Sequence, residues 1–201
     1  MIDGDRVLAA LSQPMERGHQ ERLAPMVAEA MAAAGLGFDR LERVGVTTGP
    51  GSFTGLRVGL AFAKALALAL GIPCVGLGSL EALARSAPPG DGPLAAVIDA
   101  KRGQVYLQLF NPGAPAGEPQ ALAVDDAIAA LVGQSGLRLI GSGAALLEGR
   151  IESSLIPMSF ADPVVIARLA AEAPQPLQVA RPLYLRAPDA QPQDAARLPR
   201  R

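Results

Sequence analysis

The sequence predicts an α/β protein with mixed sheets covered by helices. Three observations indicate this class: strand-like segments alternate with segments of helical periodicity, glycine turns follow several strands, and a hairpin is expected in each half of the chain. The chain has 201 residues, of which 50% are hydrophobic. That is enough apolar material to bury a core as one domain or as two small lobes.

The first half is expected to contain three strands and three helices. Its opening turn, at Asp3-Gly4, needs a strand on each side, but only Met1 and Ile2 stand before it. Apolar spacing and glycine stops place the other elements. The expected segments are a strand over 7–11, a helix over 19–34, a strand over 41–48, a helix over 54–70, a strand over 72–77 and a helix over 79–87.

Single residues refine the starts of two of these helices. Pro25 is best tolerated in a first turn, so the first helix is expected either to begin near 22–24 or to bend at the proline. Ser79 stands where it can cap the third helix, and Glu81 falls in the first turn of that helix.

A run of proline and glycine, PPGDGP over 88–93, interrupts all regular structure. It predicts a boundary between an N-terminal lobe, 1–89, and a C-terminal lobe, 93–187. Residues 188–201 are rich in Pro, Gln and Arg and are expected to fray. The second lobe is expected to hold a hairpin over 94–110 with its turn at 101–103, a helix over 125–132, a strand and glycine turn over 137–143, and a helix over 162–173 that has Pro163 in its first turn.

The most unusual stretch is TTGPGSFTGLRVGLAFAKALALALGIP, residues 47–73, where a glycine-rich loop enters a nearly all-apolar helix. Gly55, Gly59, Ala63 and Ala67 recur at four-residue spacing on one stripe of that helix. Because a glycine inside a helix costs about 1 kcal/mol relative to alanine, close backbone approach by another element is expected to offset the two glycines. Leucines fill much of the remaining surface, so the helix is expected to be buried almost all round.

The loop at the start of this helix can be compared with phosphate-binding loops. A Walker loop needs Gly-Lys-Ser/Thr, but Leu56 and Arg57 follow Gly55, and GPGSFTG has one residue too many for a dinucleotide fingerprint. A strand, a glycine loop and a helix N-terminus still form a general anion site, so a weak backbone contact to a nucleotide stays open. The residues of this motif loop are Gly49, Gly51, Ser52, Thr54 and Arg57.

Composition excludes several other classes. The net charge of −1 gives no reason to expect strong nucleic-acid binding by this chain alone. One cysteine, Cys74, and one histidine, His19, rule out an internal disulfide and a zinc cluster built from these residue types. The start of the chain lacks the pattern of a secretory signal. Residues 58–77 are apolar enough to suggest a membrane span, but Lys64 and Gly71 interrupt them, and a buried helix followed by a strand explains them better.

Residue types that often carry chemistry have simpler interpretations here. Ser52 has no histidine near it in sequence, and His19 begins an amphipathic helix, where a capping or surface role is expected. Asp99, Lys101 and Arg102 stand at a strand end and turn, where charged residues are common, and they predict a solvated hairpin tip. No catalytic residue and no metal site is therefore expected.

Four segments stand out as motifs: HQERLAPMVAEAM, GPGSFTGLRVGLAFAKALALALGIPCVGLGSLEALA, VIDAKRGQVYLQLF and RPLYLRAP. In this order and spacing they resemble the bacterial TsaB family, also called YeaZ. The resemblance spans residues 3–188, and its hallmark is the segment 49–57.

This resemblance implies a two-lobed fold of the actin, Hsp70 and sugar-kinase (ASKHA) type. It implies a role in forming N6-threonylcarbamoyladenosine next to the anticodon of tRNA, as a non-catalytic partner that binds and activates the TsaD transferase. TsaD carries the metal ligands, and the ATPase TsaE completes the complex. The resemblance further implies a cytoplasmic protein with no cofactor of its own, ATP or ADP at the interface with TsaD, tRNA bound only through the complex, no membrane, and a homodimer when TsaD is absent.

The resemblance also implies where the partner binds. In this family the helix after the glycine-rich loop and the helix before that loop meet TsaD or a second copy. The expected interface residues are Leu23, Met26, Val27, Gly55, Gly59 and Ala63. Family members have a further strand before the Asp-Gly hairpin, so the first strand of the sheet is expected to be missing from this sequence.

Two other hypotheses stay open on the sequence. One is an enzyme that acts on its own, either an ASKHA-type nucleotide-dependent phosphotransferase or a glycoprotease-like peptidase, and it predicts turnover that is lost when Asp99 is changed. The other is a self-associating regulatory module with a different client, which predicts binding to proteins outside tRNA modification.

Overall fold

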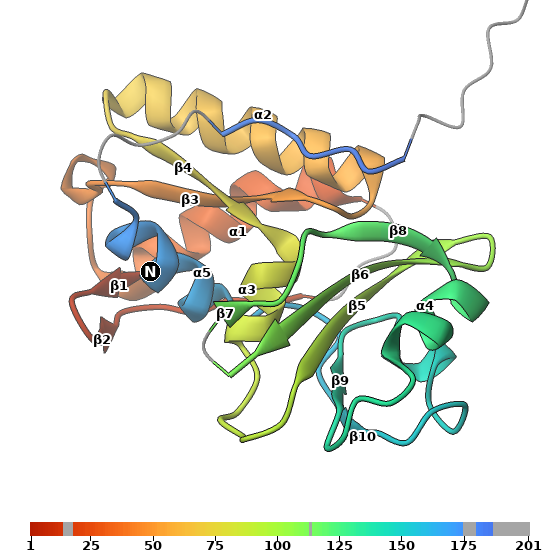
Figure 1. The fold of residues 1–201 in the computed structure, drawn as a ribbon. Helices are drawn as coiled ribbons and strands as arrows, with labels where there is room; N and C mark the ends of the chain where they lie inside the picture. Colours follow the sequence, from red (N-terminus) through yellow and green to blue (C-terminus); the bar gives the residue numbers. More distant parts are fainter. Residues whose placement is uncertain (14–17, 113, 175–179, 187–201) are drawn as a thin grey trace, which may run out of the picture.

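The computed structural model describes residues 1–13, 18–112, 114–174 and 180–186 and has two main sheets and a small hairpin (Figure 1). The first sheet pairs β3 (Val44–Gly49) with β4 (Cys74–Gly78) in parallel. The second mixes parallel and antiparallel strands. The predicted α/β class with mixed sheets and helices is confirmed. The ASKHA assignment and the missing first strand stay predictions, and the predicted tail, 188–201, lies outside the described residues.

Helices from both ends of the chain surround the first sheet. α2 (Phe53–Leu70) connects β3 to β4, and α1 (His19–Ala34) contacts α2. Figure 1 shows α2 on one side of this sheet and α5 (Pro163–Glu172) on the other. A Cβ at Gly45 of β3 would lie 2.7 Å from the Cβ of Ala170 in α5, so glycine is needed for this helix to pack closely. α5, from the C-terminal half of the chain, therefore completes the core around the first sheet.

The N-terminal hairpin is shorter than expected. β1 (Ile2–Asp3) and β2 (Arg6–Val7) pair antiparallel around the predicted turn. The prediction of a strand over 7–11 is therefore wrong beyond Val7. The reason is that β1 offers only two residues for pairing.

The helix predicted over 19–34 is confirmed as α1. The alternative, a start near 22–24, is wrong. α1 begins at His19, so Pro25 lies inside it, beyond the first turn. Gly35 ends α1 in the left-handed conformation with φ 66°, and its N–H donates to the carbonyls of the last turn.

The second sheet encloses the larger core. Its strands are β5 (Leu94–Lys101), β6 (Gln104–Asn111), β7 (Ala114–Pro115), β8 (Gln120–Ala123), β9 (Arg138–Ile140) and β10 (Ser154–Ile156). Alternate residues of β5 face opposite sides: Ala95 and Val97 pack with α4 (Val124–Leu131), and Leu94 and Ala96 pack with α3 (Ser79–Arg85). β5 is therefore a central strand buried on both faces, and the predicted hairpin with β6 is confirmed.

The two predicted helix starts in this region had different outcomes. Asp162 caps α5 by accepting a hydrogen bond from the Val164 N–H at 2.8 Å, and Pro163 lies in the first turn as predicted. The prediction that Ser79 caps α3 is wrong. β4 continues to Gly78 and α3 begins at the next residue, so Gly78 takes the cap position and Ser79 falls inside the helix.

Candidate functional site

The C-terminal segment 180–186 covers the start of the motif loop. Leu183 donates its backbone N–H to the carbonyl of Thr48 at 2.8 Å. Gly49 is buried with φ 116°, and a Cβ there would lie 2.6 Å from the carbonyl oxygen of Leu183. Both the backbone angle and this contact therefore require glycine. Further along the loop, Gly51 is half-buried and Thr54 is exposed.

Two other motif residues are engaged within the chain. Ser52 is the N-cap of α2, and its Oγ accepts a hydrogen bond from the Gly55 N–H at 3.4 Å. The Arg57 guanidinium lies 3.8 Å from the ring centroid of Phe53, and its Nε donates to the Tyr184 hydroxyl at 3.4 Å. Anions bind a helix N-terminus through its unpaired N–H groups, and the Ser52 cap occupies one of them. The weak anion contact of the loop stays a prediction.

The small-residue stripe of α2 changes its surroundings along the helix. Gly55 and Gly59 are half-buried, and a Cβ at Gly59 would meet no atom within 4 Å. Ala63 and Ala67, by contrast, are 6% and 2% exposed. The reason is geometric: at 3.6 residues per turn, positions four apart are rotated by about 40°, so the stripe turns from the surface into the core. The close contact expected to offset Gly59 is not made within the described chain, and Ala63 faces the chain's own core.

The remaining surface of α2 corrects the prediction of a helix buried almost all round. Only 22% of this 18-residue helix is buried, although its mean hydropathy is 1.5. Burial is confined to the side that packs on the sheet, and Leu68 is 84% exposed on the same face as Arg57 and Lys64. α2 is also the one helix in the described part of the chain that is long and apolar enough to cross a membrane. In this fold it packs on β3 and β4 with one side and on α1 with another, and the side with Arg57, Lys64 and Leu68 is left uncovered.

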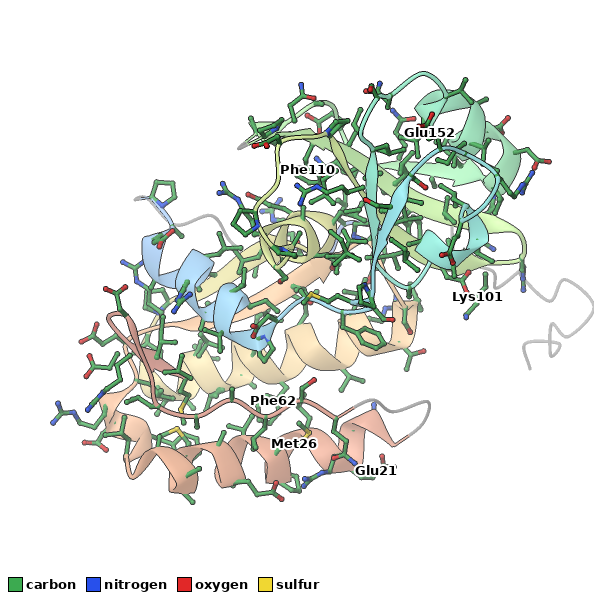
Figure 2. The ribbon with its side chains drawn as sticks, turned by 90° about the horizontal axis from the view of Figure 1, so that it is seen from below. Glu21, Met26, Phe62, Lys101, Phe110 and Glu152 are labelled. Carbon is green, nitrogen blue, oxygen red and sulfur yellow. The ribbon has the colours of Figure 1, made fainter. Side chains whose placement is uncertain are left out.

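α1 supplies the other residues predicted for the interface. Leu23, Met26 and Val27 are each half-buried. Figure 2 shows Met26 and Phe62 of α2 facing one another between the two helices. Met26 therefore lies at the seam between α1 and α2, and all three α1 residues keep part of their surface exposed.

The Asp99 carboxylate forms its hydrogen bonds and its ion pair within its own hairpin. One carboxylate oxygen accepts a hydrogen bond from the Lys101 backbone N–H at 2.7 Å, and the other pairs with Lys101 Nζ at 2.7 Å. Partial burial raises the pKa of Asp99, but the hydrogen bonds and charge of Lys101 outweigh it and the pKa lies below its ordinary value. Within the described residues, no group of three or more His, Cys, Asp or Glu side chains is placed to hold a metal ion.

The residue that sequence reasoning missed is Leu68. The pattern contained a signal for it, because Arg57 and Lys64 mark a solvent-facing side of the helix and Leu68 follows Lys64 by four residues on that side. A leucine on a face marked by charges is expected to be exposed to solvent in the isolated chain.

Sequence comparison relates this chain to proteins named for the threonylcarbamoyladenosine modification of tRNA. A family model described as "TsaD: tRNA N6-adenosine threonylcarbamoyltransferase" matches residues 12–142. The TsaB protein of Bacillus subtilis, named for tRNA threonylcarbamoyladenosine biosynthesis, is 37% identical over 111 residues, which are 55% of this chain and 48% of that protein. An uncharacterized protein of Mycobacterium tuberculosis is 38% identical over 178 residues, 88% of this chain and 79% of its own length. The match thus spans about half of the Bacillus protein and most of the mycobacterial one.

Solved structures agree with these sequence matches. The structure described as YeaZ from Pseudomonas aeruginosa superposes with a TM-score of 0.70 at 25% identity, covering 86% of this chain and 87% of that one. A second structure, described as an uncharacterized protein with similarity to peptidase YEAZ from Pseudomonas aeruginosa, gives a TM-score of 0.74 at 25% identity, with 87% of both chains covered.

Proposed function

Because the chain belongs to the TsaB (YeaZ) family and matches a family model described for the TsaD transferase, we propose that it is a non-catalytic subunit of the system that forms N6-threonylcarbamoyladenosine in tRNA. In this role it binds a TsaD homologue and activates it. Two observations support this role: the family is associated with this system, and the chain has an exposed apolar surface that a partner can cover.

The observation that carries the proposal is the uncovered face of α2. An apolar helix with only 22% of its residues buried leaves apolar surface that a partner can cover. Leu68 would supply apolar area to a partner on the side of α2 that carries Arg57 and Lys64. Gly59, nine residues earlier and so on the opposite side of the helix, has open space in front of it and would let a second element approach closely there. Gly55 and the α1 residues Leu23, Met26 and Val27 extend the surface on the Gly59 side, next to the seam between α1 and α2. Ala63, being buried, contributes by packing α2 on its own sheet.

The relation to TsaD supports a paired arrangement. Subunits with a common fold can meet through equivalent faces about an approximate two-fold axis, as identical subunits do about a true one. A second copy of this chain would use the same face when TsaD is absent. In the same proposal, TsaE joins the complex, ATP or ADP sits at the TsaD interface, tRNA binds through the complex, and the assembly is cytoplasmic.

The non-catalytic role is supported by what the polar groups do. Ser52 Oγ caps α2, and the Asp99 carboxylate is bound to Lys101 in its turn, so both have structural partners. A nucleophile is activated by a neighbouring general base, and a general base must lie within hydrogen-bond reach of the proton that it takes from the substrate.

The proposal is tested by co-purifying the native chain with the TsaD homologue of its own genome and then measuring threonylcarbamoyladenosine formation with and without the chain. We expect a stable complex and a strong dependence of product formation on the chain. Full TsaD activity without the chain, together with no physical association, would contradict the proposal.

A further inference from the structure

Exposed aromatic and cationic side chains meet where α2 begins. The ring centroids of Phe53 and Tyr184 are 5.3 Å apart with the planes inclined by 43°, and the Arg57 guanidinium stacks on Phe53. Phe53 is 38% exposed and Tyr184 is 42% exposed. The hydrogen bond from Arg57 Nε to the Tyr184 hydroxyl ties the three together. They form an ordered platform on which a flat ring can stack.

The hairpin of the second sheet brings further cations to this platform. Arg186, two residues after Tyr184, donates from its guanidinium to the carbonyl of Ala100 at 2.9 Å. Two residues of chain span at most about 7 Å, so this bond ties the hairpin to the chain segment that carries Tyr184. Lys101 and Arg102 in that turn are exposed, with positive φ angles of 63° and 55°, and the Lys101 ammonium also pairs with Asp99 at 2.7 Å. Figure 2 places Lys101 near the same end of α2.

We propose that this basic-aromatic corner, formed by Phe53, Arg57, Lys101, Arg102, Tyr184 and Arg186, contacts unpaired nucleotides of the tRNA substrate. The inference rests on the proposed function, since the assembled complex must hold tRNA. Unpaired bases stack on aromatic rings and guanidinium planes, while Lys and Arg neutralise the phosphates between them. The corner offers both kinds of group on one surface.

The corner acts as an accessory contact. The net charge of −1 gives the chain no general attraction for nucleic acid, so the corner adds to binding by the complex rather than replacing it. The corner lies at the N-terminal end of α2, next to Gly55 of the proposed partner surface, whereas Leu68 lies near the other end. Leu68 lies 11 residues after Arg57, about 16 Å further along the helix axis. Because Arg57 is on the same side of α2 as Leu68, co-purification of each corner variant checks that the contact with the partner is kept.

The test titrates a fluorescent tRNA transcript, of the class that reads codons beginning with adenosine, into the complex of this chain with its TsaD homologue. We expect Tyr184→Ala to weaken binding about 5- to 150-fold, the range for loss of one stacked base, without changing the salt dependence. Arg57→Gln is expected to weaken binding and to lower the slope of log K against log salt by about 0.7 to 0.9. Tyr184→Phe, which keeps the ring, and Arg168→Gln, which removes an exposed cation on α5, serve as controls and should bind like the native complex.

The outcomes separate this inference from the proposed function. Co-purification is measured first on every variant. If the complexes form and Tyr184→Ala and Arg57→Gln bind tRNA as tightly as the controls, the corner is not an RNA contact. If the native chain does not assemble with TsaD, the proposed function fails, and the same titration is made on the chain alone. tRNA binding that Tyr184→Ala and Arg57→Gln weaken supports the corner as an RNA contact. tRNA binding that these variants leave unchanged overturns it.

Discussion

Leu68→Arg is expected to abolish association with the TsaD homologue while leaving the chain folded. Leu68 is 84% exposed, and arginine is a good helix former, so the folding free energy should change by less than about 0.5 kcal/mol. In the complex the guanidinium would be buried without a partner, which costs about 3 to 5 kcal/mol and corresponds to an affinity loss of at least about 100-fold. Isothermal titration of the purified chain against TsaD measures the loss.

Two further variants make the result specific. Val132→Arg places the same charge at another exposed apolar position, 67% exposed at the end of α4, and should bind TsaD like the native chain. Gly59→Arg should remove binding and yet stabilise the isolated chain by up to about 1 kcal/mol, because it replaces a helical glycine that faces open space. Native-like binding by Leu68→Arg and Gly59→Arg would show that the partner sits elsewhere.

Gly141→Ala is expected to destabilise the chain by about 3 kcal/mol or more. Gly141 has φ 112°, and a Cβ there would overlap the carbonyl oxygen of Val97 and lie 2.6 Å from a methyl carbon of Leu83. A side chain at this φ is strained by about 1 to 3 kcal/mol, and forcing atoms into a packed core adds about 1 to 3 kcal/mol. Thermal unfolding followed by circular dichroism should show a fall in Tm of at least about 6 °C.

Gly133→Ala is the matched control for that substitution. Gly133 also has a positive φ, 87°, but a Cβ there would meet no atom within 4 Å. It should therefore carry only the backbone cost of about 1 to 2 kcal/mol. Equal losses of stability in the two variants would mean that the contact with Val97 and Leu83 is not tight in solution.

Local patterns predicted the elements that are determined by neighbouring residues. The helix over 19–34 ends at Gly35 because only glycine takes the left-handed conformation without cost, and α5 begins at Asp162 because its carboxylate satisfies a helix N–H. The hairpin of β5 and β6 followed from two apolar runs around a tight turn. Ser79 failed as a cap because β4 runs directly into α3, a boundary that capping preference alone cannot place.

The features that the sequence could not predict depend on contacts between distant residues. Composition showed that α2 is apolar, but not that the sheet and α1 leave the side with Leu68 uncovered. That depends on which elements reach the helix. Nothing local indicates that the segment with Leu183 and Tyr184 returns to the motif loop, or that α5 packs on Gly45. The basic-aromatic corner therefore emerges only when the start of α2, the hairpin turn and the segment with Tyr184 are seen together.

The most direct test of the central claim, that the uncovered face of α2 binds the TsaD partner, is hydroxyl-radical footprinting of the native chain with and without TsaD. This measurement reports the solvent exposure of individual side chains and needs no substitution. We predict that the oxidation rate of Leu68 falls strongly when the complex forms, while that of Val132 is unchanged. A complex that forms with Leu68 as reactive as in the free chain would contradict the account.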